Sequence, residues 1–381
     1  MIRVLVVDDS PLMVRMLSEI INEDVELCVV GSASHGYEAV RKAELLHPEV
    51  ITMDVNMPRM NGLKAVEHIM STVPIPIVMI SSLTQQGAET TIKALDLGAI
   101  DFVPKPSGYV SPDIGELAAK IIAKIKLAAK IRVVRTTINH SSQTQPFSHP
   151  SIRQKQTTCK EDDVDIEEAI FKYVRSHAAG NAYHYDRIVV IGCSTGGPQA
   201  LNEILSRFPE HFPAPVLVVQ HMPGKFTAKL AELLNVRIPL HVVEAREGMR
   251  IRKGMVYIAP GSAHMKILAD RTIALVRGAQ KAAEPCPSVN MLMQSASEVF
   301  GSQVIGVILT GMGNDGAEGM NAIKDANGST IAQDEETSLV FGMPRVAIES
   351  GCVDSIVPLP LIAAEITSLT RPNKGKKKRK I

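Results

Sequence analysis

The stretch Arg187-Ile188-Val189-Val190-Ile191-Gly192-Cys193-Ser194-Thr195-Gly196-Gly197-Pro198 decides how the second half of the chain folds. Four consecutive branched apolar residues before a glycine are typical of a strand that is buried on both faces of a sheet. The strand ends in a loop of small residues, and proline favours the first turn of a following helix. Ser194 therefore lies on a sharp turn at the carboxyl end of a strand, where open α/β sheets bind their ligands.

Two further apolar runs end in polar residues of the kind that hydrolases use. Residues 215–220 predict a buried strand followed by His221, and residues 304–309 predict another, followed by a glycine-rich loop that contains Asp315. Because parallel strands present their carboxyl ends at one edge of a sheet, Ser194, His221 and Asp315 should converge. A serine hydroxyl needs an adjacent base, so His221 would take its proton and Asp315 would stabilise the imidazolium.

Each of these residues has a simpler interpretation when it is taken alone. Gly192 to Gly196 matches the pattern G-x-S-x-G, but glycine-rich strand-to-helix loops more often bind phosphate or only turn the chain. A single histidine at a strand end is more often structural, and Asn-Asp-Gly is more often a turn. The three together favour catalysis. Their order, Ser, His, Asp, differs from that of the α/β-hydrolases, so we do not expect that fold.

The rest of the second half predicts a doubly wound, mostly parallel α/β domain over residues 185–370. Residues 266–268 and 273–276 alternate like an antiparallel hairpin around a turn at 269–272. The other elements expected here are helices to about 205, around 228–234, at 289–300 and from about 317, and strands at 241–244, 256–258 and 330–333.

The first 127 residues alternate apolar strands with amphipathic helices, which predicts a parallel sheet covered on both faces. Polar residues follow these strands, so they should meet at one edge. Several carboxylates together need a cation, and hard oxygen ligands suit Mg²⁺; a lysine and a hydroxyl beside them could hold phosphoryl oxygens. One such acid alone would be a solvated residue or a helix cap, but five polar residues at matching positions argue for a site. The strands are expected at 2–7, 27–31, 50–53, 75–80 and 99–103, and the polar residues are Asp8, Asp9, Asp54, Ser81 and Lys105.

These residues, with Asp54-Val55-Asn56-Met57-Pro58 and Lys105-Pro106, resemble the receiver domain of bacterial response regulators. The resemblance implies a flavodoxin-like fold with five parallel strands, and a phosphoryl group transferred from a histidine kinase to Asp54. Phosphorylation adds charge and acceptor oxygens, so the domain would act as a switch for the second half of the chain. The residues implied by the resemblance are Asp8, Asp9, Asp54 and the Asn56 carbonyl for Mg²⁺, Ser81 and Lys105 for the phosphoryl oxygens, and Phe102 as a switch aromatic.

The second half resembles the chemotaxis methylesterase family. The matching motifs are Cys193–Gly197, Gln220–Pro223, Tyr257–Gly261, Leu309–Gly316 and Phe341–Arg345. The resemblance implies hydrolysis of glutamate γ-methyl esters on chemoreceptors and deamidation of receptor glutamines, without a cofactor in this domain. It places the triad on Ser194, His221 and Asp315, with the Met312 amide and the Thr195 loop at the oxyanion. The unphosphorylated receiver is then expected to pack over the catalytic cleft.

Two departures from the family pattern and two other functions stay open. Cys193 replaces a smaller residue such as alanine, and residues 284–290 replace an Arg-Pro-Ser-Val-Asp pattern, which leaves substrate contacts there in doubt. One alternative is a non-enzymatic response regulator that binds chemoreceptors as an adaptor or phosphate sink. The other is an esterase or amidase that acts on another protein or a small molecule.

Composition limits the class of protein and its surroundings. The 41 basic and 40 acidic residues balance, so the net charge gives no argument for nucleic acid or an acidic partner, and we expect no nucleic acid partner. No apolar run approaches the ~20 residues that span a bilayer, and the N-terminus reaches acid too early for a signal peptide, so we expect no membrane insertion. The five scattered cysteines fit a reducing compartment, the cytoplasm. We expect a polar linker with a short helix at 128–184 and a basic disordered tail at 371–381.

Overall fold

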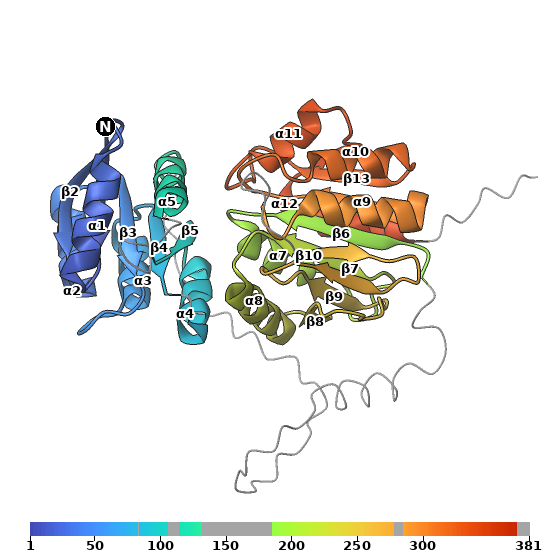
Figure 1. Ribbon diagram of the computed structural model, residues 1–381, viewed down its shortest axis with the longest axis horizontal. Helices are drawn as coiled ribbons and strands as arrows, with labels where there is room; N and C mark the ends of the chain where they lie inside the picture. The colour runs from blue at the N-terminus through green and yellow to red at the C-terminus, as the bar shows by residue number, and fades with distance from the viewer. Residues whose placement is uncertain (83, 106–113, 132–184, 278–284, 372–381) are drawn as a thin grey trace, which may run out of the picture.

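The computed structural model describes residues 1–82, 84–105, 114–131, 185–277 and 285–371. It contains two parallel sheets, one from each half of the chain, and each sheet carries helices on both faces (Figure 1). The predicted linker helix and nearly all of the basic tail lie outside the described residues. No helix in the described part of the chain is long and apolar enough to cross a membrane.

The N-terminal sheet has five parallel strands in the order β2-β1-β3-β4-β5, which confirms the prediction. Alternate residues of β1 point to opposite faces: Val4 and Val6 pack with helices α1 and α5, and Leu5 and Val7 pack with α2, α3 and α4. The elements are β1 (Ile2–Val7), α1 (Pro11–Asn22), β2 (Leu27–Ala33), α2 (Gly36–Leu46), β3 (Val50–Asp54), α3 (Gly62–Thr72), β4 (Ile77–Ser81), α4 (Gln85–Asp96), β5 (Asp101–Pro104) and α5 (Ile114–Ala128).

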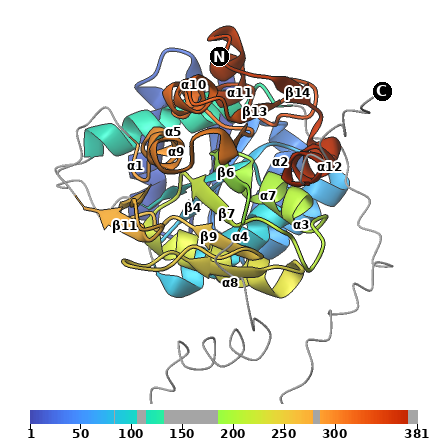
Figure 2. The same cartoon turned by 90° about the vertical axis from the view of Figure 1, so that its right-hand side faces the viewer.

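The C-terminal sheet has seven parallel strands in the order β14-β13-β12-β6-β7-β9-β8, and β10 and β11 form a separate antiparallel hairpin. Both features confirm the predicted fold class. Helices α7, α8 and α12 cover one face, and α9, α10 and α11 cover the other (Figures 1 and 2). The strands are β6 (Ile188–Cys193), β7 (Val216–Gln220), β8 (His241–Glu244), β9 (Met255–Ile258), β10 (His264–Ile267), β11 (Ile273–Val276), β12 (Val304–Ile308), β13 (Ser329–Gln333) and β14 (Ser355–Val357). The helices are α7 (Gly197–Leu205), α8 (Gly224–Arg237), α9 (Val289–Phe300), the 3-10 turn η1 (Gly301–Gln303), α10 (Ala317–Asp325), α11 (Met343–Glu349) and α12 (Leu359–Thr370).

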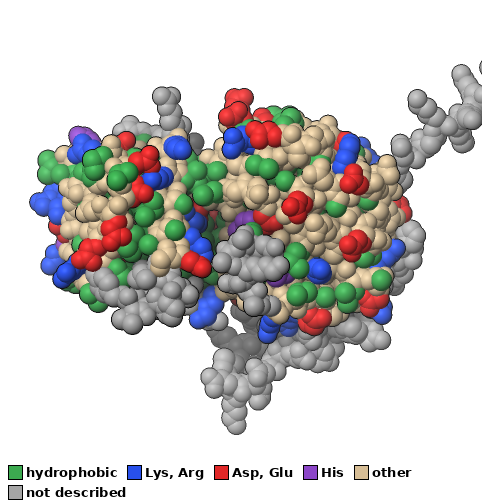
Figure 3. Space-filling view, turned by 45° about the horizontal axis from the view of Figure 1, so that its top comes forward, with side chains coloured by type: hydrophobic (Ala, Val, Ile, Leu, Met, Phe, Trp, Pro, Cys, Tyr) green, Lys and Arg blue, Asp and Glu red, His purple; other side chains and the backbone are tan. Residues whose placement is uncertain are grey.

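The two halves contact each other through α4 and β5 on one side and α8 on the other. Phe102 of β5 stacks on Phe226 of α8 with ring centroids 4.3 Å apart. An ion pair of 2.8 Å joins Arg237 to Asp96 at the rim of this contact. On the face shown in Figure 3, acidic and basic side chains are interspersed over both halves and neither sign dominates.

Candidate functional site

The three strands that carry the predicted triad are neighbours in the C-terminal sheet. β6 lies between β12 and β7, so the loops after all three strands meet at one edge. Main-chain hydrogen bonds join these loops: the amide of Ser194 donates to the Thr310 carbonyl at 3.0 Å, and the amide of His221 donates to the Cys193 carbonyl at 3.1 Å. The strand order thus brings Ser194, His221 and the Asp315 loop together, as the sequence predicted.

His221 and Asp315 form the closest pair of this site. His221 Nε2 lies 2.8 Å from Asp315 Oδ2. The carboxylate also accepts the amides of Val289 at 2.7 Å and Asn290 at 2.9 Å, which begin helix α9. Burial raises the pKa of Asp315, but the hydrogen bonds from His221 and these amides outweigh it and hold that pKa below its ordinary value. The helix dipole acts in the same direction, so the aspartate is held ionised.

Ser194 stands next to this pair, but its hydroxyl does not contact it. No hydrogen bond joins Ser194 Oγ to His221 in this structure, in which both residues are described. Because Nε2 faces Asp315, Nδ1 is the nitrogen left for the serine. Catalytic hydrogen bonds are often long before substrate binds, so this geometry is compatible with a base that engages later.

The loop after β12 packs against Ser194, since a Cβ atom on Gly311 would lie 2.8 Å from Ser194 Cβ. Met312 is 47% exposed, and its amide donates no hydrogen bond within the described residues, so it is free to face a ligand. A groove of about 990 Å³ opens beside it. Its lining includes Phe341, Gly342 and Arg345 of the C-terminal half and Leu127 and Lys130 of the N-terminal half.

Cys193 is turned away from this space. Its side chain is fully buried and its Sγ donates to Gln220 Oε1 at 3.0 Å. Burial raises the pKa of the thiol, so it stays protonated and cannot compete with Ser194 as a nucleophile.

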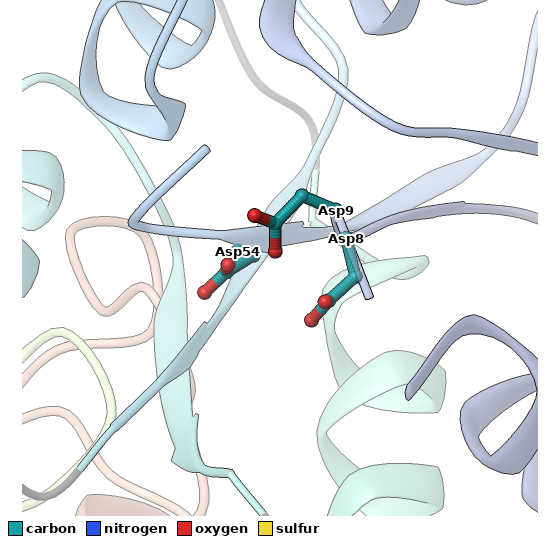
Figure 4. Close-up of side chains that lie close together, drawn as sticks. All are labelled: Asp8, Asp9 and Asp54. Atoms are coloured by element: carbon teal, nitrogen blue, oxygen red, sulfur yellow. The ribbon is translucent and has the colours of Figure 1, made fainter. Parts of the chain in front are cut away.

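A second cluster of polar residues lies at the edge of the N-terminal sheet. Carboxylate oxygens of Asp8, Asp9 and Asp54 lie within 4.8 Å of one another, and Figure 4 shows the three groups close together at the ends of their strands. Lys105 Nζ lies 2.9 Å from both Asp8 Oδ2 and Asp54 Oδ2. Oxygen ligands at this spacing are the set that a hard divalent cation prefers.

The charges of this cluster are only partly balanced. Burial raises the pKa of Asp54, and neighbouring Asp8 adds to the rise, although Lys105 opposes it. Burial would lower the pKa of Lys105, but its hydrogen bonds to the two aspartates outweigh burial and raise it. A buried carboxylate whose ionised form is disfavoured gains from an added cation.

Neither Ser81 nor Asn56 makes a hydrogen bond to the three aspartates of this cluster. Ser81 is fully buried, and its hydroxyl bonds to Thr91 Oγ1 at 2.7 Å and to the Gly87 carbonyl at 3.3 Å. Asn56 is exposed, which leaves its carbonyl accessible. Phe102, the predicted switch aromatic, is only 4% exposed because it packs against Phe226 at the contact between the halves.

Comparison with known proteins identifies the family of nearly the whole chain. A family model described as CheB methylesterase matches residues 189–366, and one described as response regulator receiver domain matches residues 4–111. A protein-glutamate methylesterase/protein-glutamine glutaminase of Pyrococcus abyssi is 42% identical over 98% of this chain and 95% of its own length. The chain belongs to the chemotaxis methylesterase family. A relative of the same name from Archaeoglobus fulgidus is 43% identical over 96% of this chain and 97% of its own length. The CheB methylesterase catalytic domain of Thermotoga maritima is 42% identical, with a TM-score of 0.46, over 48% of this chain and 98% of that one.

Family membership favours the enzyme over the non-enzymatic adaptor, because the methylesterase model spans the region that carries Ser194, His221 and Asp315. It also makes the N-terminal half a receiver domain, and the acidic cluster lies within the matched region.

The receiver domain contacts the residue that follows Ser194. Thr195 Oγ1 donates to the carboxylate of Asp101 in β5, and Lys124 of α5 lies 2.7 Å from the same carboxylate. Gln199 of α7 donates to the Leu95 carbonyl at the end of α4, at 2.9 Å. The Thr195 hydroxyl is therefore occupied by the receiver domain in this state and does not face an oxyanion.

Three residues to which the sequence motifs assigned no role contact the predicted catalytic residues or the loops that carry them. Ser288 Oγ donates to Asp315 Oδ1 at 3.1 Å. Asn290 Oδ1 accepts the amides of Gly316 and Gly319 at 2.8 and 2.9 Å, so it fixes the turn after Asp315. Ser288 could have been found, because a serine before a helical run is a helix N-cap signal. Asn290 stood where the motif departed from its family. The third residue, Gln220, lay within the matching motif Gln220–Pro223, but the motif gave its side chain no role.

Proposed function

We propose that this chain is a phosphorylation-controlled serine hydrolase that removes methyl esters from glutamate side chains of chemoreceptors and deamidates receptor glutamines. The observation that carries the proposal is the His221–Asp315 pair, 2.8 Å apart, beside a serine on the next strand of a sheet that matches the methylesterase family. The relatives carry both activities in their names. The resemblance to the chemotaxis methylesterases supports chemoreceptors as the substrates.

In this mechanism Ser194 is the nucleophile and His221 is the base. Ser194 Oγ attacks the side-chain ester carbonyl while its proton passes to His221 Nδ1, the nitrogen that Asp315 leaves free. The imidazolium gives that proton to the leaving methanol, or to ammonia when the substrate is glutamine. Water then attacks the acyl-enzyme, with His221 again as base, and releases glutamate and Ser194.

Two further groups stabilise charge during this reaction. The amide of Met312, which has no partner among the described residues, donates to the developing oxyanion. Asp315 stabilises the imidazolium. Burial raises the pKa of Asp315, but His221 and the amides of α9 outweigh burial and hold that pKa below its ordinary value, so the carboxylate is ionised at neutral pH. No step requires a cofactor in the catalytic domain.

Asp54 is the proposed phosphoacceptor of the receiver domain. Asp8, Asp9, Asp54 and the Asn56 carbonyl would hold Mg²⁺, which supplies positive charge to the phosphoryl oxygens. Lys105, already 2.9 Å from Asp54, would hold one of those oxygens. Ser81 would reach another after its hydroxyl leaves Thr91 and Gly87, which couples phosphorylation to α4.

The contact between the halves gives phosphorylation a route to Ser194. In the described state, Asp101 binds the Thr195 hydroxyl, and α5 forms one wall of the groove beside Met312. Phosphorylation at Asp54 shifts β4, β5 and α4, which carry this contact, and so opens the groove to a receptor helix. The partners are then a chemotaxis histidine kinase as phosphodonor and the cytoplasmic part of chemoreceptors as substrate, which places the chain in the cytoplasm.

Methanol release from methylated receptor membranes tests the chemistry. Ser194→Ala should abolish release, and Ser206→Ala, an exposed serine at the end of the same helix α7, should leave it unchanged. A Ser194→Ala protein that still releases methanol would exclude Ser194 as nucleophile.

A further inference from the structure

A buried glutamine connects the main chains of the two residues proposed to exchange the proton. Gln220 ends β7 directly before His221 and is 1% exposed. Its Nε2 donates to the carbonyl of Ser194 at 2.8 Å and also lies 3.4 Å from the carbonyl of His221. Its Oε1 accepts from Cys193 Sγ at 3.0 Å. One side chain therefore contacts the residue before the serine, the serine itself and the histidine.

Burial of this amide needs an explanation other than packing. A buried amide loses its hydration and stabilises the fold only when its donors and acceptor are used, whereas an apolar side chain would fill the space without that loss. The polar atoms of Gln220 form hydrogen bonds with Cys193 and Ser194 at the end of β6 and with the adjacent residue His221. The gain is therefore a fixed position for the Ser194 loop relative to β7.

The side-chain amide of Gln220 packs closely against the first residue of α7, Gly197. A Cβ atom on Gly197 would lie 1.9 Å from Gln220 Oε1, so only glycine fits there while the amide keeps its place. The amide of Gly197 also donates to the Ser194 carbonyl, at 2.8 Å. Two donors thus hold this carbonyl, one from α7 and one from Gln220.

No hydrogen bond between their side chains holds Ser194 and His221 together in this structure. With no hydrogen bond between Ser194 Oγ and His221 among the described contacts, the relative position of the two residues is set by their main chains. We propose that Gln220 is a positioning residue that fixes the main chain of Ser194 against that of His221, so that the hydroxyl meets Nδ1 when substrate binds. This inference rests on the proposed roles of Ser194 and His221.

The test measures how fast Ser194 reacts with a fluorophosphonate probe, a step in which the serine oxygen bonds to phosphorus and fluoride leaves. Gln220→Met keeps the length of the side chain and removes its polar atoms. It should slow labelling and lower kcat for methanol release by about tenfold or more, with KM within about threefold, because misplacement of a reacting group acts on the chemical step.

Gly197→Ala gives an independent perturbation that leaves Gln220 in the chain. The added methyl group displaces the amide, so labelling should slow as it does in Gln220→Met. In a Gln220→Ala background, which empties that space, Gly197→Ala should add little further loss, which a double-mutant cycle measures. If Gln220→Met does not fold, the labelling rate of Gly197→Ala decides whether Gln220 is a positioning residue.

Thr330→Val is the matched control, since it removes buried hydrogen bonds from the same sheet, to the Cys352 carbonyl and Asp354, without contact to either proposed catalytic residue. It should lower stability and keep the labelling rate. A Gln220→Met protein that labels at the wild-type rate would overturn the positioning role. Failure of the wild-type protein itself to label at Ser194 would instead count against the proposed function.

Discussion

The receiver domain and the catalytic domain both place an aspartate at the carboxyl end of a parallel strand, but they treat its charge in opposite ways. Burial raises the pKa of Asp315, but hydrogen bonds from His221 and the amides of α9 outweigh burial and hold that pKa low. Asp54 is buried beside another aspartate with one lysine shared between them, which raises its pKa. The charge of Asp315, the proposed catalytic aspartate, is stabilised by its neighbours, whereas the charge of Asp54 is only partly compensated by Lys105. This difference suits a constant role in one domain and a switched role in the other.

Loss of the Asp315 carboxylate should have the largest effect on activity. Under the proposed mechanism, Asp315→Asn removes the charge that stabilises the imidazolium and alters the histidine tautomer, so kcat should fall by about 10⁴-fold. Methanol release under substrate saturation measures it, with circular dichroism to verify folding. A fall of less than about tenfold would mean that Asp315 only supports the loop.

Removal of divalent cations should affect the receiver domain alone. In a chelator, a phosphodonor should no longer phosphorylate Asp54, because the crowded carboxylates keep their unbalanced charge. Stimulation of methanol release should disappear, while the unstimulated rate stays unchanged because the catalytic domain needs no metal. Phosphoryl incorporation and methanol release are measured on the same sample, and full stimulation in chelator would contradict the cation site.

Breaking the contact between the domains should raise the unstimulated rate. Asp101→Ala removes the acceptor that binds Thr195 and the partner of Lys124, and a hydrogen bond to a charged group is worth enough to change the population of open molecules by about tenfold. Asp24→Ala, which loses a lysine partner elsewhere on the receiver, is the control. An unchanged unstimulated rate in Asp101→Ala would show that this contact does not restrain the site.

The smallest effect should be on stability, with opposite signs at the two aspartates. Because the folded pKa of Asp54 is raised, its ionised form destabilises the fold at neutral pH, and this penalty disappears as the pH falls through the folded pKa. Asp54→Asn should raise the unfolding midpoint at pH 7 by a few degrees, and the gain should shrink in acid. Asp315→Asn should instead lower the midpoint at pH 7, and its loss should also shrink as the pH falls through the low folded pKa of Asp315. Thermal unfolding measures both midpoints. A shift of the same sign in Asp54→Asn and Asp315→Asn at pH 7 would contradict the opposite treatment of the two charges.

Much of this architecture could be read from the sequence, because apolar strands buried on both faces and the polar residues after them leave local patterns. The strand at Ile2–Val7 was predicted with its observed bounds, and the helix Val289–Phe300 likewise. Three C-terminal elements, α11, β14 and α12, were not predicted; β14 is three residues long and only half-buried, so it leaves little periodicity.

The contacts that orient the site could not be predicted in the same way. Gln220, Ser288 and Asn290 contact loops that are distant from them in sequence, and these partners are fixed only once the strand order is known. The same holds for Thr195 and Asp101, which lie 94 positions apart. The predicted role of Ser81 involves a hydroxyl that is bonded to Thr91 and Gly87 in this state, because a sequence pattern cannot tell which of two switch positions a hydroxyl occupies.

The most direct test of the central claim is methanol release from methylated receptor membranes, measured with the wild-type chain and Asp54→Ala before and after addition of a small-molecule phosphodonor. We expect the phosphodonor to stimulate the wild type, the unstimulated rate to be equal in both proteins, and Asp54→Ala not to respond. Stimulation that survives in Asp54→Ala, or its absence from a wild-type chain that has been phosphorylated, would contradict control of the serine by the receiver aspartate.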